Sequence, residues 1–396
     1  MTHEVGSPRA APSPARSLAP DLARGFMLLF IALANAQFFL VGPDPVRTVL
    51  DQGVALVQST LVNGRAIALF ALVFGYGMVR ILERVRAQGG GWVHARVLLR
   101  RRGWAMLAIG FAHAALFLPV DIVGTYGLAL VLFVGLLRAR DTTLLWTAGL
   151  IAALSAVLNT VLVALLISGG EDGSVSAPSL SQEVFRLAVV ERVQEWLLYT
   201  PITLLLVALP MILLGVWAGR RRLLEEPGRH RALLVRTAVI GLGTAVAVGL
   251  PDALMAAHLV PEAPPLTAGL LAVAHDLGGW PGGLGWAAVL ALVAWRLEDR
   301  RSEDRHGPLV RAVAAVGERS LTCYLTQSVV FTLVFAPYAG GLGATLGATG
   351  AAAVAVATWS CTVVLAEVLR RAGRRGPAEA VLRRLTYART SHTPVP

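Results

Sequence analysis

One histidine of this sequence is placed for acid–base chemistry. His113 follows Arg102 by eleven residues, about three helical turns, so the two side chains share a helix face with Gly110. Asp121 comes after a tight turn, and helices joined so closely must be antiparallel neighbours, which brings its carboxylate within reach of His113. A carboxylate beside one imidazole nitrogen holds the tautomer of a general base. The alternative reading is a buried histidine satisfied by a neighbouring hydroxyl or carbonyl.

The same spacing occurs nearer the N-terminus. Arg24 and Asn35 are eleven residues apart and share a helix face, roughly 16 Å from each other along the axis. Asp21, three residues before Arg24, is best explained as the cap of that helix. Arg24 is either an anion-binding residue or one of many cytoplasmic anchors, and the sequence leaves both readings open.

A third polar stretch runs from Gly317 to Ser328 and leads directly into an apolar run that ends at Phe335. We expect one continuous membrane-crossing helix whose polar side chains occupy nearly the full circumference, with only Leu321 and Leu325 able to meet lipid. Polar groups facing hydrocarbon cost several kcal/mol unless they are paired, so this helix should lie in the middle of a bundle. These groups are either a functional site or hydrogen-bonding contacts between helices.

Composition identifies the class of protein that must position these side chains. The chain has 396 residues, 56% of them hydrophobic, and a mean hydropathy of +0.65. Its apolar residues fall in runs of about 18 or more, which predicts an all-α, polytopic integral membrane protein. The net charge of +11 comes from arginines beside the apolar runs, without an aromatic-rich basic face, so nucleic acid is not an expected partner. Cys323 and Cys361 both lie inside predicted spans, so neither a disulfide framework nor a metal site is expected.

Ten transmembrane helices are predicted, with both termini in the cytoplasm. Thirty of the 35 basic residues fall in alternate connections, which assigns those connections to the inside. His275 and Asp276 form a second acid–base candidate within the eighth span, where a glycine-rich stretch at 278–283 should break the helix. The predicted spans are 24–41, 64–83, 102–119, 122–138, 143–167, 199–218, 233–257, 266–296, 319–337 and 346–369.

The remaining segments flank the membrane domain of residues 21–372. Residues 1–20 are rich in proline, alanine, serine and arginine and are predicted to be a disordered cytoplasmic tail. Residues 181–198 are predicted to form an amphipathic helix on the outer surface, and residues 373–396 a basic amphipathic tail at the inner leaflet.

Taken together, these residues resemble the YeiB family, a poorly characterised group described as transport-related. The opening motif is also similar to that of transmembrane acyltransferases, including acyltransferase family 3 and heparan-alpha-glucosaminide N-acetyltransferase. Those proteins pass an acyl group from cytoplasmic acyl-CoA to an acceptor across the bilayer. The matching residues are Asp21–Phe26 with Asn35, Phe70–Gly77, Arg101–Arg102 with Gly110 and His113, Asp121–Ile122 with Tyr126, Glu318–Ser328, Gly376–Glu379 and Arg383–Tyr387.

This chain departs from both acyltransferases where a base is needed. Asn35 stands where acyltransferase family 3 has a histidine. The sugar acetyltransferase also has asparagine there but carries a histidine shortly afterwards, and residues 37–51 of this chain contain none. If the reaction is retained, His113 must supply the base.

The resemblance implies an acyltransferase of the bacterial plasma membrane that uses acyl-CoA, such as acetyl-CoA, as co-substrate and needs no metal. Arg24, Arg102 and Arg319 would bind the phosphates of the donor. The expected partners are the lipid bilayer, a small-molecule, lipid or sugar acceptor and, as an open option, a second copy of the chain. The alternatives are a transporter or flippase for a small anionic or lipid-linked substrate, and a membrane scaffold. For an acyltransferase, the catalytic residues would be His113, Asp121 and Asn35, and the substrate-binding residues would be Tyr126, Tyr324, Gln327 and Ser328.

Overall fold

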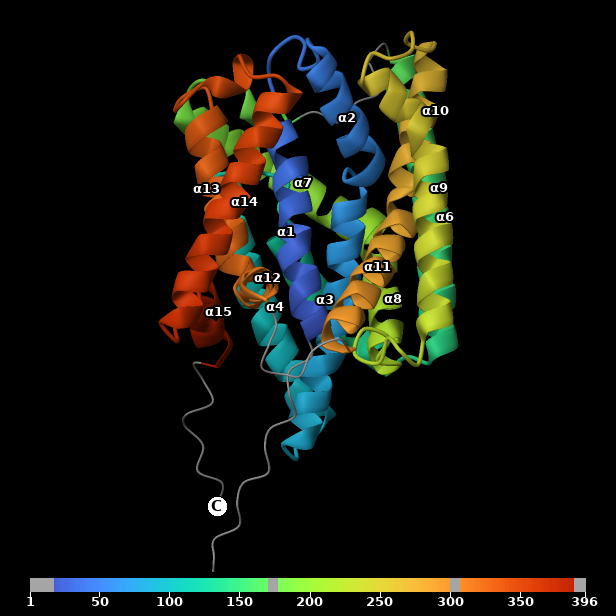
Figure 1. Ribbon diagram of the computed structural model, residues 1–396, viewed down its shortest axis with the longest axis vertical. Coiled ribbons are helices and arrows are strands. Elements are labelled where there is room, and N and C mark those ends of the chain that lie inside the picture. Colours follow the sequence, from blue (N-terminus) through green and yellow to red (C-terminus); the bar gives the residue numbers. More distant parts are fainter. Residues whose placement is uncertain (1–17, 170–176, 300–306, 388–396) are drawn as a thin grey trace, which may run out of the picture.

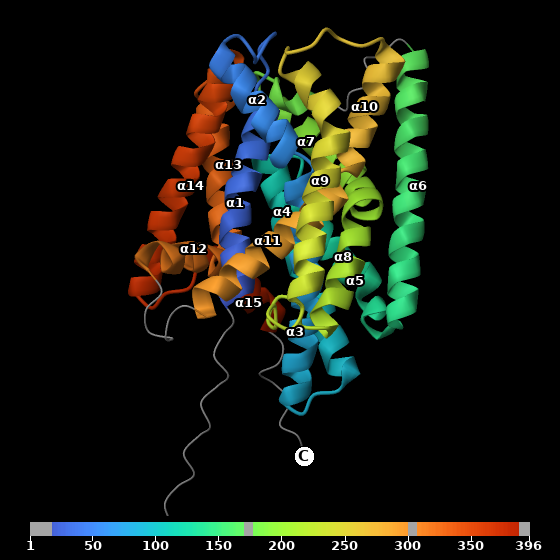
Figure 2. The same ribbon diagram turned by 45° about the vertical axis from the view of Figure 1, so that its right-hand side comes forward.

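The computed structural model describes residues 18–169, 177–299 and 307–387, and every regular element in these ranges is helical. The expected tail of residues 1–20 and the last residues of the 373–396 segment therefore fall largely outside the described ranges. Most helices stand upright side by side, while α12 lies crosswise near the lower end (Figures 1 and 2).

The long helices are α1 (Leu18–Phe38), α2 (Val49–Leu61), α3 (Arg65–Ala87), α4 (Trp92–Leu116), α6 (Asp141–Ser168), α7 (Phe185–Ile202), α9 (Arg231–Ala256), α10 (Pro265–Leu277), α11 (Gly279–Asp299), α13 (Ser320–Phe335) and α14 (Ala348–Arg371). The shorter ones are α5 (Ile122–Phe133), η1 (Val134–Arg138), η2 (Pro178–Leu180), η3 (Thr203–Ala208), α8 (Leu209–Arg220), α12 (Pro308–Glu318), η4 (Leu342–Ala344) and α15 (Pro377–Tyr387).

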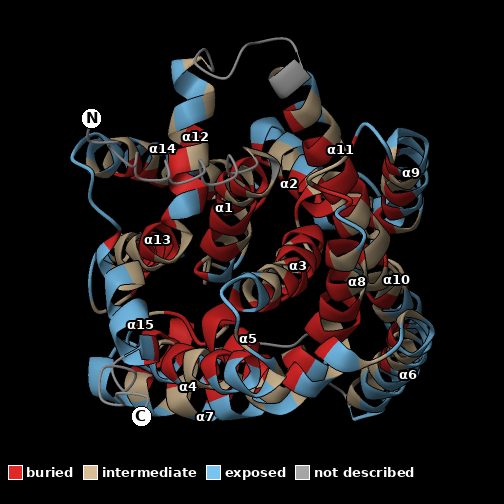
Figure 3. Cartoon of the chain, turned by 90° about the horizontal axis from the view of Figure 1, so that it is seen from below, coloured by how far each residue is buried: buried red, intermediate tan, exposed pale blue. Residues whose placement is uncertain are grey.

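The bundle has the surface of a membrane protein. Within the described residues, seven helical runs are long and apolar enough to cross a bilayer. Only 6% of the most apolar window of α6 is buried, so this helix offers its leucines and valines to the surroundings, as lipid contact requires. Viewed from below, buried residues gather at the centre of the bundle and exposed ones at its rim (Figure 3). The chain is thus an all-helical, polytopic membrane protein.

The number of ten spans remains a prediction, because three of the expected membrane-crossing helices are too short or too charged to count among these seven. Helix α4 carries four arginines, and α5 and α13 are apolar but short. All three still stand inside the bundle (Figure 3). The connections α3–α4, η1–α6, α8–α9 and α14–α15, which hold many of the arginines, share the lower end of the molecule (Figure 1). The positive-inside rule predicts that this end faces the cytoplasm.

Two breaks distinguish the structure from uninterrupted spans. The break expected within 266–296 is present at Gly278, between α10 and α11. The polar stretch, by contrast, is not one helix, because α12 ends at Glu318 and α13 begins at Ser320. Gly317 explains this break, because a Cβ atom there would collide with the backbone carbonyl of Asp21. Helix α12 therefore packs directly across α1, and the chain must change direction before α13 can begin. The expectation of a continuous helix from Gly317 is therefore wrong.

The segment predicted as an outer amphipathic helix, residues 181–198, overlaps α7. This helix runs on through the π-helical turn η3 into α8, and the whole run from Phe185 to Arg220 is one of the candidate membrane spans. Two of its charged residues, Arg192 and Glu195, are buried, and each is bound within the protein.

Candidate functional site

Three polar side chains from separate helices meet inside the bundle. The Nδ1 atom of His113 on α4 lies 2.9 Å from Oδ1 of Asp121, and its Nε2 atom lies 2.8 Å from the hydroxyl oxygen of Ser328 on α13. Each of the three residues is at most 4% exposed. We call this set the Asp–His–Ser relay. It has the order of groups, carboxylate, imidazole and hydroxyl, that activates a nucleophile in hydrolases and transferases.

Local sequence places the carboxylate of the relay. Asp121 is the N-cap of α5, and its oxygens accept hydrogen bonds from the backbone amides of Val123 and Gly124. These two amides fix the position of the carboxylate beside the imidazole. The contact with His113 is short but poorly aligned for a hydrogen bond, so it acts mainly through charge. Gly110 provides the space that this carboxylate occupies, because a Cβ atom at residue 110 would collide with Asp121.

Buried donors without partners surround the relay. The ring of Tyr324 lies 4.9 Å from that of His113 between centroids, and its hydroxyl approaches the backbone of Ile122 but donates to no acceptor within the described chain. The same holds for the hydroxyl of Tyr126 and the indole N–H of Trp196, which packs on the first turn of α5 at Gly124. Buried polar groups are nearly always paired, so a cluster of unpaired ones calls for an explanation. These three unpaired groups are donors, which suits a ligand that brings acceptor oxygens.

The other predicted members of the site are less closely joined to the relay. Gln327 is buried on α13, where its amide nitrogen donates to the backbone carbonyl of Leu28 at 3.4 Å and its oxygen lacks a partner in the described structure. Asn35 is buried on α1, and its amide makes no hydrogen bond to another described residue. The structure therefore brings Asp121, Tyr126, Tyr324 and Ser328 together around His113, but it does not link Asn35 to them.

An arginine-lined cavity of about 1300 Å³ lies at the lower end of the bundle. It contains Arg24 and Arg102, which the sequence predicted to share a site, although they come from α1 and α4. Among its described lining residues are six arginines and four acids, so the arginines are in excess. The wall also contains Glu225, whose pKa is raised above its ordinary value by burial, while Arg80 at 2.9 Å opposes that shift. The arginines of the wall are Arg24, Arg80, Arg84, Arg86, Arg102 and Arg222.

Stacked aromatic rings connect the wall of this cavity to α5. Phe74 is part of the cavity wall, and its ring stacks on that of Tyr126 with centroids 4.6 Å apart. Phe70 stacks on Tyr126 as well, at 5.6 Å. Tyr126 in turn lies five residues beyond Asp121 on α5, which is about 1.4 helical turns. The stack thus links the wall of the arginine cavity to α5, the helix that Asp121 caps.

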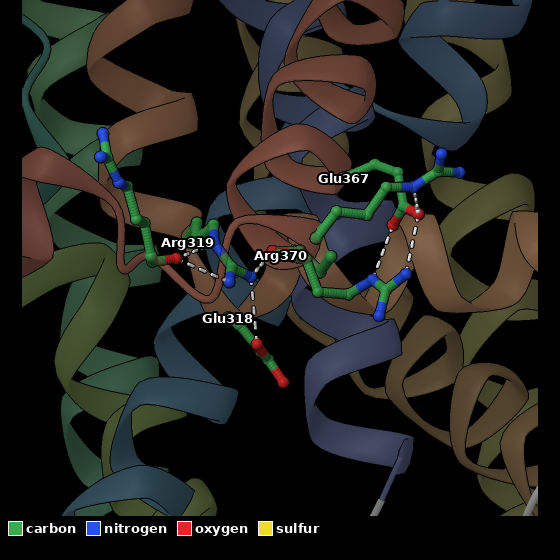
Figure 4. A network of polar contacts seen from close by, with 7 residues as sticks. Glu318, Arg319, Glu367 and Arg370 are labelled. Carbon is green, nitrogen blue, oxygen red and sulfur yellow. Dashed lines mark hydrogen bonds and ion pairs between the residues drawn. The ribbon is translucent and has the colours of Figure 1, made fainter.

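Arg319 does not join this cavity. Its guanidinium donates to the backbone carbonyl of Arg374 from Nε at 3.3 Å and from Nη2 at 2.9 Å, and Nη1 donates to Glu318 at 3.1 Å (Figure 4). These contacts tie the break between α12 and α13 to the segment that precedes α15. The prediction that Arg319 shares an anion site with Arg24 and Arg102 finds no support in this arrangement, because its donors are already used.

A reciprocal pair of helix caps, which the sequence did not reveal, positions α13. Oε1 of Glu379 on α15 accepts the backbone amides of Leu321 and Thr322 at 2.8 and 3.1 Å, and its Oε2 accepts the hydroxyl of Thr322. That hydroxyl in turn accepts the backbone amide of Ala378, at the start of α15. We call this pair of caps the C-terminal latch. Its only sequence signal was the acidic residue in the Gly376–Glu379 motif, which resembled an ordinary first turn.

Removing the latch should destabilise the helix that carries Ser328. We expect Glu379→Ala to lower the unfolding free energy by about 1–2 kcal/mol, because the first turn of α13 loses its cap and buried amides lose their acceptor. Thermal unfolding in detergent measures this. Glu367→Ala is the matched control, since Glu367 pairs only with Arg370 and Arg371 near the surface (Figure 4) and should change stability little. Equal effects of the two substitutions would contradict the latch.

The second acid–base candidate, His275, belongs to a separate buried cluster. Its Nε2 atom lies 2.6 Å from Nη1 of Arg65, which is fully buried, while its Nδ1 atom lies 3.4 Å from Asp276. Arg65 also donates to the backbone carbonyls of Asn63 and Ala245. The cluster fastens α3 to α9 and α10, and within the described structure none of its members lines the arginine cavity.

Comparison with known proteins finds relatives that are themselves uncharacterised. Residues 218–389, which include Ser328 and the C-terminal latch, match the family described as Protein of unknown function (DUF418). The chain is 26% identical to Uncharacterized protein YxaH of Bacillus subtilis, over 93% of either chain. It is also 26% identical to Uncharacterized protein YeiB of Escherichia coli, over 94% of this chain and 96% of that one. No solved structure matches. The resemblance to the YeiB family is confirmed by this family match and by the two relatives.

Proposed function

We propose that this protein is a membrane-embedded acyltransferase that passes an acyl group from cytoplasmic acyl-CoA to an acceptor hydroxyl or amine at or across the membrane. The observation that carries the proposal is the buried Asp–His–Ser relay, ringed by unpaired donors, beyond the wall of a cavity rich in arginine. We propose the bacterial plasma membrane as its site of action, which the apolar helices and the bacterial origin of the two relatives support.

The arginine cavity suits the anionic part of the donor. Coenzyme A carries several phosphate charges, and guanidinium groups bind phosphate through charge-assisted, often bidentate hydrogen bonds. Arg102 lies about 16 Å from His113 along α4, so a donor held at its phosphates must extend an arm of that order to reach the relay. The pantetheine arm of coenzyme A is an extended chain that carries the thioester at its far end, which fits this division of the site.

The Asp–His–Ser relay suits the thioester end of the donor, where the reaction takes place. With Asp121 beside Nδ1, the proton of neutral His113 is held on that atom, and Nε2 is free to accept a proton from an attacking hydroxyl or amine. Attack on a thioester places negative charge on the carbonyl oxygen. The hydroxyls of Tyr126 and Tyr324 are the nearest unpaired donors that could stabilise it.

The stacked rings of Phe74 and Tyr126 would act as a gate that controls access from the arginine cavity to the relay. Phe74 and Tyr126 must separate for the thioester to pass, which a rotation of either side chain achieves. A closed gate keeps water from the relay and so limits hydrolysis of the thioester.

Reconstituted protein tests the proposal. Liposomes that contain the purified chain and receive labelled acetyl-CoA should release coenzyme A faster than protein-free liposomes, and label should move to an added acceptor such as glucosamine or glycerol. Release at the protein-free rate, while labelled acetate or phosphate equilibrates across the bilayer, would show transport and overturn the proposal. The arginines would then serve as an anion site on a permeation path.

A further inference from the structure

Ser328 differs from eight other hydroxyl residues in the described helices. A serine or threonine inside a membrane helix usually satisfies its hydroxyl by donating to the carbonyl four residues earlier. In the described structure eight others do so, at 2.6–2.9 Å. The corresponding distance from Ser328 to Tyr324 is 3.4 Å, because its hydroxyl is turned toward Nε2 of His113 at 2.8 Å. The eight are Thr60, Thr125, Ser155, Thr160, Thr326, Thr358, Ser360 and Thr386.

The direction of that hydrogen bond follows from the charge on the far side of the ring. Asp121 is held by two backbone amides with its carboxylate 2.9 Å from Nδ1, and a carboxylate in this place favours the tautomer of His113 that carries its proton on Nδ1. Nε2 is then an acceptor, and the hydroxyl of Ser328 must be the donor. A serine that donates to a histidine backed by a carboxylate is an activated nucleophile.

We infer that Ser328 is the residue that carries the acyl group, as an ester, between donor and acceptor. This inference rests on the proposed acyltransferase function and goes beyond it, since acyl transfer could also run directly from donor to acceptor with His113 as the base. In the first step the Ser328 oxygen attacks the thioester carbonyl and its proton passes to Nε2 of His113. The bond from carbon to sulfur then breaks, and coenzyme A leaves as the thiol with that proton.

The second step reverses the roles. The acceptor hydroxyl or amine gives its proton to Nε2 and attacks the ester carbonyl, and the bond from carbon to the Ser328 oxygen breaks. The serine oxygen takes the proton back, so the relay returns to its starting state. Acyl-CoA and acceptor become coenzyme A and acylated acceptor, and neither an oxidant nor a metal enters the balance.

The shape of the site favours this covalent route. All three members of the relay are buried, none of them lines the arginine cavity, and the wall residue Phe74 stacks on Tyr126 of α5. A direct transfer needs donor and acceptor at the relay together, with both approaches open. An acyl ester on Ser328 lets coenzyme A leave before the acceptor arrives, so the two sides of the membrane need never be connected through the site.

The intermediate can be trapped on the full-length protein. Purified wild type in liposomes, given labelled acetyl-CoA without acceptor, should release a burst of about one coenzyme A per chain. After denaturation and digestion, mass spectrometry should find one acetyl group on the peptide of α13, at Ser328. The label should leave when hydroxylamine or an acceptor is added. Ser328→Ala should show neither burst nor label, and Ser328→Cys should regain a labelled, slower intermediate as a thioester.

Ser360→Ala is the matched control, because Ser360 is an exposed helical serine with an ordinary bond to the carbonyl four residues back. Its burst should equal that of wild type. Thermal unfolding separates loss of chemistry from loss of fold, since serine to alanine is well tolerated in helices. Transfer to acceptor by Ser328→Ala at the wild-type rate, without label, would overturn the inference and leave the proposed function intact. Wild type that neither releases coenzyme A nor transfers label would remove both.

Discussion

His113→Ala is expected to reduce acyl transfer by about 10²- to 10⁴-fold, the usual contribution of a positioned general base. His113 is the only described side chain that contacts both Asp121 and the hydroxyl of Ser328, so its removal leaves the serine without a proton acceptor. The rate of coenzyme A release in the liposome assay measures the effect. A second variant, His113→Gln, keeps a polar group of similar length but cannot act as a base, and it should be equally inactive.

His94→Ala is the control for this prediction. His94 lies on the same helix, near its lower end, and is exposed. Its replacement should leave the rate of coenzyme A release unchanged. Both variants at His113 must also unfold near the wild-type temperature for the loss to be assigned to chemistry. If His113→Gln released coenzyme A at the wild-type rate in folded form, the relay would have no role in the reaction.

Arg102→Ala is expected to raise the KM for acetyl-CoA by about ten- to a hundredfold, because a charge-assisted hydrogen bond to phosphate contributes about 1.5–3 kcal/mol. The kcat should change much less, since the phosphates lie far from the thioester and are bound equally in the ground and transition states. The KM of wild type should also rise with ionic strength, and that of Arg102→Ala should rise less steeply.

Arg101→Ala is the matched control for Arg102. Arg101 is the neighbouring residue on α4 but is not part of the cavity wall, since one residue along a helix turns the side chain by about 100°. Its KM should stay near that of wild type. Equal increases in KM for the two variants would mean that acetyl-CoA is attracted by the general positive charge at the lower end of the molecule rather than bound in the cavity.

Local geometry explains why half of the relay was predictable. A run of apolar residues specifies a helix, and a tight turn between two such helices forces them to lie antiparallel. His113 and Asp121 are only eight residues apart, so their meeting at 2.9 Å follows from that turn. The common cavity of Arg24 and Arg102 was predictable for a related reason, because topology brings the ends of their helices to one side of the membrane.

The partners of α13 could not be derived in that way. Ser328 lies 215 residues from His113 along the chain, and nothing in the spacing of either segment indicates which face of α13 meets α4. That face is set by contacts between distant backbones, such as the close crossing at Gly317, and by the caps that Glu379 supplies to the first turn of α13. Arg319 shows the same limit, since its expected phosphate site is replaced by backbone carbonyls.

The amino-acid sequence by itself thus determined the membrane class, the positions of most helices, the arginine-rich end and the pairing of His113 with Asp121. Each of these depends on hydrophobic run length, charge distribution or a short turn, which act within a few residues. Only the tertiary structure decided that Ser328 completes the relay, that aromatic rings link the wall of the arginine cavity to α5, and that Arg319 and Glu379 hold the C-terminal segment instead of a ligand. Those features depend on which helix faces pack together, and packing is settled by contacts between side chains and backbones that lie far apart in the chain.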